Sequence, residues 1–273
     1  MINACSALGR LGYPVVYLPV NADGIVTPDV LEKVITTQTK LVSVMLVNNE
    51  IGTVEPICEL AAVAHASTAL FHTDAVQAVG HIPIDVNELC VDMLSASAHK
   101  FNGPKGVGFL YVRKGTLLSP YVDGGAQEYG MRAGTENVAS IVGMATALKK
   151  SCDEMQQTTA KLRMMENIFI DTLSQANVDF IRNGAVNRVP GNINISIRNA
   201  SGEVLLHRLD LKGISVSTGS ACDSVNTKVS HVIQAIGVPQ EYAKGTIRVS
   251  FGRDNELKDA VEVAKAVADV LQR

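Results

Sequence analysis

Tryptophan is absent from this 273-residue chain, and aromatic residues of all types make up only 4% of it. The formal net charge is −3 and no basic run with interleaved aromatic residues occurs, so a nucleic-acid-binding surface is not expected. The most apolar run, Leu41 to Val47, is much shorter than the ~18 residues that a membrane span requires. The first charged residue is Arg10, so a secretory n-region is not expected. We therefore expect a cytoplasmic protein without a membrane anchor.

Cysteine is also sparse, with five residues separated by 53, 32, 62 and 70 positions. Zinc and iron-sulfur sites use ligands two to four residues apart, so the sequence predicts no metal site. An odd cysteine count without a leader argues against a disulfide framework. Cys222 follows the small, polar stretch 215–221, which favours a loop, and there a functional thiol and an inert one are equally compatible with the pattern. The other four lie among apolar or helix-forming neighbours and are expected to be inert: Cys5, Cys58, Cys90 and Cys152.

Hydrophobic periodicity predicts an α/β protein of two domains. In the first half, short β-rich runs alternate with helical patterns, which is typical of a mostly parallel sheet with helices on both faces. A helix is expected to begin at Thr27-Pro28-Asp29 and another to cover about 56–68. The predicted strands are 15–20, 41–47, 69–73, 91–96 and 107–112.

Apolar residues recur at helical spacing from about 134 to 175, which predicts a long helix or a helix pair joining the two domains. We expect a large domain over 1–150 and a smaller C-terminal α/β domain over 151–273. The predicted elements of the smaller domain are strands 192–197 and 246–251 and helices near 203–211, 229–236 and 256–271.

Polar residues follow two of the predicted strands. Asp74 comes directly after one strand with Gln77 a turn later, and Ser97, His99 and Lys100 follow the next. The carboxyl ends of parallel strands form the crevice where ligands bind, so these residues should converge there. Alone, such a lysine most often points to solvent, and such an aspartate most often caps a turn. Together they suit pyridoxal phosphate, which needs a lysine for its aldehyde and a carboxylate for its pyridine nitrogen.

Seven motifs, in family order over nearly the whole chain, resemble the cysteine desulfurases of the NifS and IscS type. They are NNEIG at 48–52, HTDAVQ at 72–77, SAHKFNGPKG at 97–106, GMRAGT at 130–135, PGNIN at 190–194, GSAC at 219–222 and IRVSFG at 247–252. The resemblance implies a class V aminotransferase of the pyridoxal-phosphate transferase fold type I. Such an enzyme converts L-cysteine to L-alanine and keeps the sulfur as a persulfide on its own cysteine.

The resemblance also implies a role for individual residues. Lys100 would bind the cofactor aldehyde and later move the substrate α-proton, with Asp74 on the pyridine nitrogen and Gln77 and Asn49 on the side of the ring hydroxyl. Asn49 would also contact the substrate.

The phosphate and the substrate have implied partners too. Ser97 and His99 would hold the phosphate, with His99 also counted among the catalytic groups, and Thr135 would reach the phosphate of a partner subunit, as in the family's homodimer. Arg248 would bind the substrate carboxylate, and Cys222 would receive the sulfur as a thiolate.

The family's N-terminal phosphate loop and ring-stacking histidine have no counterpart in this sequence. Two other hypotheses therefore stay open at this stage. The chain could be a selenocysteine lyase or a class V transaminase. Cys222 distinguishes a desulfurase from this alternative, because a transaminase needs no persulfide thiol. It could also be a truncated inactive or regulatory subunit that needs a separate N-terminal partner. The sulfur acceptor, an iron-sulfur scaffold or a thiolation carrier, also stays open.

Overall fold

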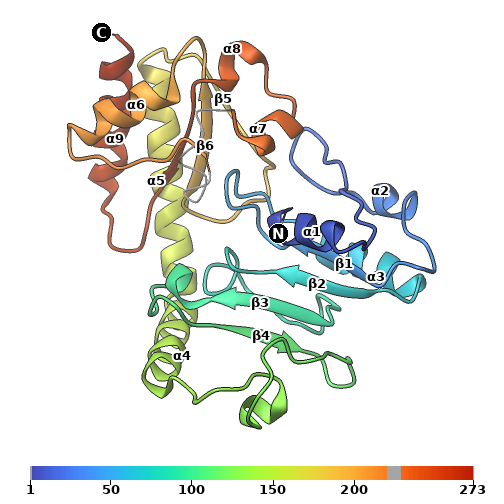
Figure 1. The fold of residues 1–273 in the computed structure, drawn as a ribbon. Coiled ribbons are helices and arrows are strands. Elements are labelled where there is room, and N and C mark those ends of the chain that lie inside the picture. The colour runs from blue at the N-terminus through green and yellow to red at the C-terminus, as the bar shows by residue number, and fades with distance from the viewer. Residues whose placement is uncertain (1, 220–228, 273) are drawn as a thin grey trace.

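The computed structural model describes residues 2–219 and 229–272 of the protein. Its larger sheet has the strand order β1-β2-β3-β4, in which β1, β2 and β3 are parallel and β4 is antiparallel (Figure 1). Its strands are β1 (Leu41–Met45), β2 (Leu70–Asp74), β3 (Met93–Ser97) and β4 (Gly108–Val112). This mostly parallel sheet confirms the predicted α/β class, and each of these strands overlaps a predicted one.

One face of the larger sheet is apolar. Val42, Val44 and Phe71 alternate along their strands with more exposed residues and point into the core. The predicted helices that begin near residues 27 and 56 are confirmed as α2 (Pro28–Glu32) and α3 (Ile57–Ala66). On α3, the inward side chains at helical spacing are Ile57, Leu60, Ala61 and Ala64. Burial of each large apolar side chain stabilises the fold by about 1.5–3 kcal/mol.

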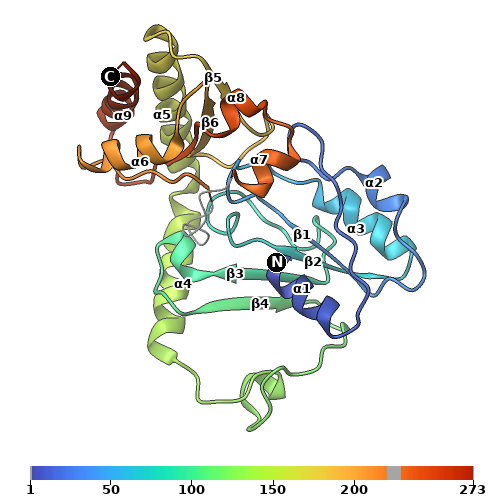
Figure 2. The same ribbon diagram turned by 45° about the horizontal axis from the view of Figure 1, so that its top comes forward.

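The opposite face of the larger sheet is polar and partly exposed. His72 of β2 lies between two hydroxyl groups, with Ser43 Oγ 2.8 Å from its Nδ1 and Ser95 Oγ 3.2 Å from its Nε2. Burial lowers the pKa of His72, against the opposing effect of the Asp74 charge. Helix α1 (Ile2–Arg10) projects in front of the sheet in both ribbon views and buries none of its residues (Figures 1 and 2).

The strand predicted over 15–20 is wrong. Within the described residues this segment belongs to no sheet. Leu18 and Val20 pack against apolar clusters, whereas Val16 and Tyr17 are 64% and 56% exposed. The β-rich apolar pattern therefore reflects a connecting segment that runs along the edge of the core with no strand beside it to complete a ladder.

A helix pair follows the larger sheet, as the periodicity predicts. Helices α4 (Val138–Asp153) and α5 (Met155–Gln175) meet at Glu154, and α5 leads to a second sheet (Figure 1). This antiparallel sheet has the order β5-β6-β7, with strands β5 (Phe180–Arg182), β6 (Asn192–Ile197) and β7 (Thr246–Ser250). The sequence pattern predicts β6 and β7 but misses β5, which has only three residues. The domain boundary at 150/151 stays a prediction, supported by the separate cores of the two sheets.

The two faces of the second sheet differ in polarity, because successive side chains along a strand point to opposite faces. Ile193, Ile195 and Ile247 are fully buried in a core shared with α5, α6 and α9. The remaining helices of this part are α6 (Gly202–Asp210), α7 (His231–Ala235), α8 (Gln240–Ala243) and α9 (Leu257–Leu271). The other face is polar and carries Asn192, Asn194, Ser196, Thr246, Arg248 and Ser250.

That polar face holds a turn of the larger part, residues 48–54, which we call the junction turn. Asn192 Nδ2 and Arg248 Nη1 both donate to the backbone oxygen of Asn49, at 3.4 and 2.8 Å. Asn194 Nδ2 donates to the backbone oxygen of Glu50 at 3.2 Å. Backbone bonds add to these contacts, from Val189 N to Gly52 O and from Val54 N to Asn187 O. The junction turn therefore fixes how the two sheets sit against each other.

Among the described residues, every helix is too short or too polar to pass through a lipid bilayer.

Glu55 lies next to the junction turn, and the pH dependence of stability tests how it is packed. The residue is 8% exposed, and its Oε2 accepts a hydrogen bond from Val26 N at 2.9 Å. Burial raises the pKa of the Glu55 carboxyl from 4.5 to about 7. The folded chain thus binds a proton more tightly than the unfolded chain. The stabilising contribution is complete below about pH 4.5 and is lost as the pH rises through about 7.

We expect Glu55→Gln to remove most of this pH dependence. Because each unit of pKa shift corresponds to about 1.4 kcal/mol, the wild-type free energy of unfolding should fall by up to about 3 kcal/mol more than that of the variant between pH 5 and pH 8. Denaturant titrations at both pH values measure the difference. Parallel pH profiles of the two proteins would contradict the burial of an ionisable Glu55.

Candidate active site

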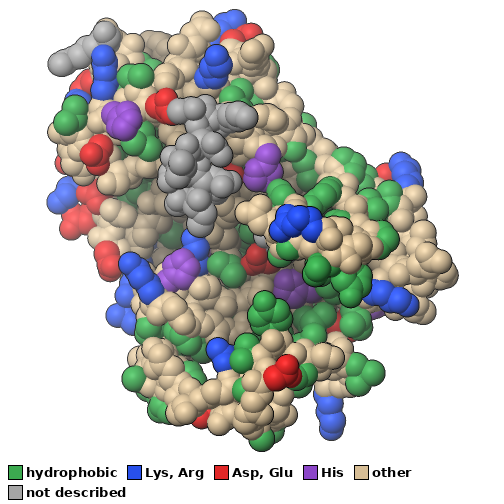
Figure 3. All heavy atoms as spheres, in the orientation of Figure 1, with side chains coloured by type: hydrophobic (Ala, Val, Ile, Leu, Met, Phe, Trp, Pro, Cys, Tyr) green, Lys and Arg blue, Asp and Glu red, His purple; other side chains and the backbone are tan. Residues whose placement is uncertain are grey.

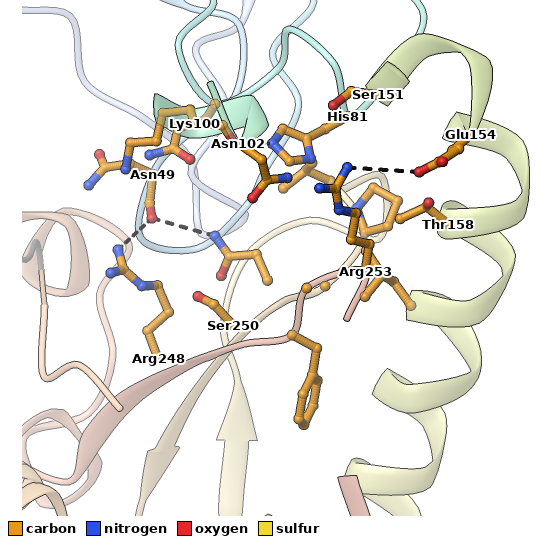
Figure 4. Close-up of a pocket in the computed structure, with 18 residues that line it drawn as sticks. Asn49, His81, Lys100, Asn102, Ser151, Glu154, Thr158, Arg248, Ser250 and Arg253 are labelled. Atoms are coloured by element: carbon orange, nitrogen blue, oxygen red, sulfur yellow. Dashed lines mark hydrogen bonds and ion pairs between the residues drawn. The ribbon is translucent and has the colours of Figure 1, made fainter. Parts of the chain in front are cut away.

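A cavity of about 280 Å³ lies between the two sheets and is lined by both parts of the chain (Figure 4). The larger part contributes Asn49, Gln77 and Lys100, and the smaller part contributes Arg248 and Ser250. On the molecular surface, lysine or arginine, acidic and histidine side chains surround a hollow between the two parts (Figure 3). The cavity thus combines charged groups of both signs with amides and hydroxyls.

Lys100 reaches the cavity because β3 ends in a short 3₁₀ helix, η1 (Ala98–Phe101). Asn102 closes η1 in the left-handed conformation, at φ 64°, and Gly103 N donates back to Ala98 O at 2.8 Å. His81 Nε2 donates to the backbone oxygen of Lys100 at 2.8 Å. The backbone of Lys100 is therefore held at the carboxyl edge of the sheet while its side chain lines the cavity.

Arg248 reaches the same cavity from the middle of β7. Its backbone pairs with Asn194 on one side, and on the other it forms a bridge with Ser217. Its Nη1 donates to Asn49 O, the atom that also accepts from Asn192 (Figure 4). One backbone oxygen of the larger part therefore orients the guanidinium of the smaller part.

The structure places other predicted site residues outside this cavity. Asp74 ends β2 on the polar face of the larger sheet, half-buried, and its Oδ1 accepts a hydrogen bond from Val76 N at 3.1 Å. Ser97 is half-buried at the end of β3, whereas His99 and Thr135 are exposed. Cys222 lies outside the described residues. The cavity thus gathers Lys100, Gln77, Asn49 and Arg248, and the roles predicted for the whole set stay predictions.

Sequence reasoning assigned no role to Asn192, which also lines the cavity. Its Oδ1 is buried and accepts no hydrogen bond within the described part of the chain. Asn192 faces Ser250 in the β6–β7 ladder, two pairs along from the pair of Asn194 and Arg248, so it lies on the same face of the sheet as Arg248. Polar residues alternate along β6 in the sequence, but Asn49, the partner of Asn192 on the junction turn, is 143 residues away.

The far end of the cavity carries an ion pair that the sequence pattern also did not reveal. Arg253 Nη1 lies 3.8 Å from Glu154 Oε2, at the break between α4 and α5 (Figure 4). Lys161 Nζ donates to the backbone oxygen of Arg253 at 2.7 Å. Both side chains of the ion pair are partly exposed, so solvent screening keeps its contribution to stability small.

Comparisons with known proteins agree with this arrangement. The family model for aminotransferase class-V matches residues 1–263. The chain is 48% identical over 274 residues to the cysteine desulfurase IscS of Dictyoglomus turgidum and 42% identical over 273 residues to that of Methanosarcina thermophila. In both cases the match covers 100% of this chain and 68% of the relative.

Solved structures give the same result. A NifS-like protein superposes with a TM-score of 0.91 at 34% identity, covering 99% of this chain and 72% of the other. SspA, solved in complex with cysteine, superposes with a TM-score of 0.77 at 33% identity, covering 92% of this chain and 70% of the other.

The cavity wall beside Asn192 depends on Gly191. This residue has φ +81°, and a Cβ built on it would lie 2.6 Å from the backbone oxygen of Phe251. Gly213 has a similar φ of +77° but open space around it. We expect Gly191→Ala to lower the free energy of unfolding by about 2 kcal/mol more than Gly213→Ala, because only the first adds a clash to the backbone strain. Thermal or denaturant unfolding measures this, and equal losses would contradict the close contact at Phe251.

Proposed function

Because the chain belongs to the aminotransferase class-V family and, within it, to the cysteine desulfurases, we propose that the cavity between its sheets is where L-cysteine is converted to L-alanine. The sulfur passes to an enzyme cysteine and then to an acceptor protein. The observation that carries this proposal is that Lys100 and Arg248, from different parts of the fold, line one cavity. A lysine so placed can hold the cofactor aldehyde with which the substrate amine reacts, and the arginine can bind the substrate carboxylate.

The side chains around the cavity suit pyridoxal phosphate. A lysine amine is available for the aldehyde, and the amides of Asn49 and Gln77 are available for the ring hydroxyl side. The Asp74 carboxylate stands at the carboxyl edge of the neighbouring strand, where a pyridine nitrogen can pair with it. The buried Asn192 Oδ1 supports a ligand in this space, because a buried acceptor without a donor is unfavourable until a ligand supplies one.

Hydroxyl and imidazole groups are proposed to bind the phosphate of the cofactor. Ser97 ends β3 and His99 lies in η1, and both are available to donate to phosphate oxygens. Thr135 is exposed, which suits contact with a group held by a second copy of the chain. The homodimer is thus part of this proposal, with Thr135 completing the phosphate site of the partner subunit.

Pyridoxal phosphate, when bound, supplies an electron sink that stabilises negative charge on the substrate α-carbon. Lys100 holds the cofactor and then carries the proton at its Nζ. The hydrogen bond from His81 holds the backbone of Lys100 in place while its side chain moves. His99 lies next to Lys100 in η1 and is exposed, and we propose that it assists the proton transfer at Lys100.

Arg248 binds the substrate carboxylate in this account. A planar guanidinium donates two parallel hydrogen bonds to a carboxylate, and a lysine ammonium cannot reproduce that geometry. The bond from Nη1 to Asn49 O sets the plane of the group before substrate arrives. Asn49 therefore contributes twice, with its side chain toward the cofactor and its backbone toward Arg248.

The sulfur-accepting residue is Cys222, which lies outside the described residues. Its thiolate attacks the sulfur of the substrate, so that an S–S bond forms while the bond from this sulfur to the substrate β-carbon breaks. The electrons of the broken bond stay with that carbon, which takes a proton and becomes the methyl group of L-alanine. A thiol of the acceptor protein then attacks the outer sulfur of the persulfide and releases the Cys222 thiol. An iron-sulfur scaffold and a thiolation carrier are both suitable acceptors. The cytoplasmic location expected from the sequence stays a prediction.

Lys100→Ala tests the proposed cofactor site. With pyridoxal phosphate added, the wild-type chain should develop the visible absorbance of a lysine Schiff base, and the variant should not. Formation of L-alanine from L-cysteine should fall by about 100-fold or more, because both the attachment and the proton carrier are lost. The exposed Lys105 provides a control, since Lys105→Ala should keep both signals. Unchanged absorbance in Lys100→Ala would contradict the proposed site.

Arg248→Lys tests recognition of the substrate carboxylate. The KM for L-cysteine should rise by about tenfold or more, because a charge-assisted pair of hydrogen bonds contributes about 1.5–3 kcal/mol. The absorbance from the cofactor should stay at the wild-type level. Arg198→Lys is the control, because Arg198 lies on the surface of the smaller part and pairs with Asp179 and Glu241. A wild-type KM in Arg248→Lys would assign the carboxylate to another residue.

A further inference from the structure

Glu166 is a buried carboxylate of α5 that the proposed chemistry does not use. The residue is 2% exposed, and both of its carboxylate oxygens accept hydrogen bonds. Oε2 accepts from Arg182 Nη2 at 2.8 Å and from Arg163 Nη1 at 3.2 Å. Oε1 accepts from the backbone N of Gly191 at 2.6 Å. Because a buried charge is unfavourable without such donors, this carboxylate joins α5 both to β5 and to the segment before β6.

Three arginines lie around this single carboxylate. Besides Arg163 and Arg182, Arg188 is 7% exposed, and Arg163 Nη2 donates to its backbone oxygen. Burial and the charge of Arg182 lower the pKa of Arg188 to about 10, whereas the charge of Glu166 acts in the opposite direction. Among the residues that the structure describes, no other carboxylate lies within ion-pair distance of these guanidiniums. Glu166 therefore compensates groups that repel one another.

Gly191 is the point at which this carboxylate reaches the cavity. Gly191 and its neighbour Asn192 both line the cavity. The backbone of Gly191 is bound on two sides, because its N donates to Glu166 and its O accepts from Phe251 N at 2.9 Å. Phe251 directly follows β7. One residue thus links α5 to the strand that carries Arg248.

The segment around this glycine, residues 189–192, lines the cavity throughout, and we call it the wall segment. It binds the junction turn at both of its ends. The backbone N of Val189 donates to a backbone oxygen of the turn at 2.9 Å, and Asn192 Nδ2 donates to Asn49 O at 3.4 Å. Asn49 O is also the acceptor for Arg248 Nη1. The position of the wall segment therefore affects the oxygen that orients this guanidinium.

From these contacts we infer that Glu166 is a positioning residue for substrate binding: its Oε1 fixes the wall segment, and the wall segment places the acceptor that orients Arg248. This inference rests on the proposed function, because it gives Glu166 a part in binding the carboxylate of L-cysteine. Glu166 acts through Gly191 and Asn49 and touches no reacting atom. Its other oxygen, Oε2, binds only the arginines, so the two contacts of the carboxylate can be tested separately.

Amide exchange at Gly191, followed by NMR, tests the contact without cofactor or substrate. Glu166→Gln keeps the shape of the side chain but has one oxygen, for which the charged guanidiniums compete. We expect exchange at Gly191 to become faster by on the order of tenfold, because an NH2 group replaces its acceptor. Arg182→Gln is the matched control, since it removes a partner of Oε2 and leaves the Oε1 bond in place. Wild-type exchange in Glu166→Gln, or equally fast exchange in Arg182→Gln, would overturn the inference.

The KM for L-cysteine is the readout that a purely structural role would not change. In Glu166→Gln it should rise by about tenfold, because the guanidinium of Arg248 loses its fixed orientation. The absorbance of the bound cofactor and the rate at saturating L-cysteine should stay at the wild-type level. Arg182→Gln should lower the resistance to denaturant, because a buried charge loses a donor, and yet keep the wild-type KM. A wild-type KM in Glu166→Gln, or the same rise in both variants, would assign Glu166 a structural role alone.

A double variant keeps the test decisive where Glu166→Gln alone folds poorly. Glu166→Gln combined with Arg182→Gln removes one charge of each sign, so the net charge of the cluster does not change. Its KM for L-cysteine should exceed that of Arg182→Gln by about tenfold, since only the double variant lacks the Oε1 contact. Equal KM values of these two proteins would overturn the inference.

The inference and the proposed function fail differently. A wild-type chain that forms no L-alanine from L-cysteine would contradict the proposed function, and exchange at Gly191 would still decide whether Glu166 holds the wall segment. A wild-type chain that forms L-alanine with a KM that Glu166→Gln leaves unchanged would contradict the positioning role alone.

Discussion

The two sheets are joined by hydrogen bonds from the smaller part to backbone groups of the junction turn. The oxygens of Asn49, Glu50 and Gly52 accept from Arg248, Asn192, Asn194 and Val189, and Val54 N donates to Asn187 O. Backbone polar groups in a protein interior need partners, so separating the sheets would expose or orphan several at once. The relative position of the sheets, and with it the cavity, follows from this requirement.

The chemistry of the site follows from the same constraint. The larger sheet supplies Lys100 at the end of one parallel strand, and the smaller sheet supplies Arg248 from the polar face of β7. Neither sheet alone supplies both of these groups. A cysteine desulfurase needs both groups and also a thiol that comes close to the substrate sulfur. The junction turn is hydrogen-bonded to Arg248 through the backbone oxygen of Asn49.

The sequence predicts the local part of this arrangement well. Strands β1 to β4, β6 and β7 and the paired helices α4 and α5 follow from apolar periodicity, because one face of each packs against a core. The motif at 97–106 correctly indicated a lysine at the end of a strand. The failed strand at 15–20 shows the limit of the same reasoning, since a β-rich apolar run can also form a largely exposed connecting segment in which only some side chains, such as Leu18 and Val20, pack against a core.

Long-range contacts explain what the sequence did not reveal. Asn192, Glu50 and Ser230 each look like ordinary polar residues of a strand, a turn and a helix cap. Their roles arise from partners 143 and 180 residues away, which no local pattern encodes. The seven motifs carried family information about residues near the site, but they did not indicate that the Glu50 carboxylate of the first motif would accept a hydrogen bond from Ser230.

The most direct test of the account follows the sulfur atom itself. The purified chain, supplied with pyridoxal phosphate and L-cysteine labelled at sulfur, should yield L-alanine and carry the label on Cys222, as mass spectrometry of the peptide that contains this residue would show. Formation of L-alanine without label on Cys222, or no L-alanine at all, would contradict the account.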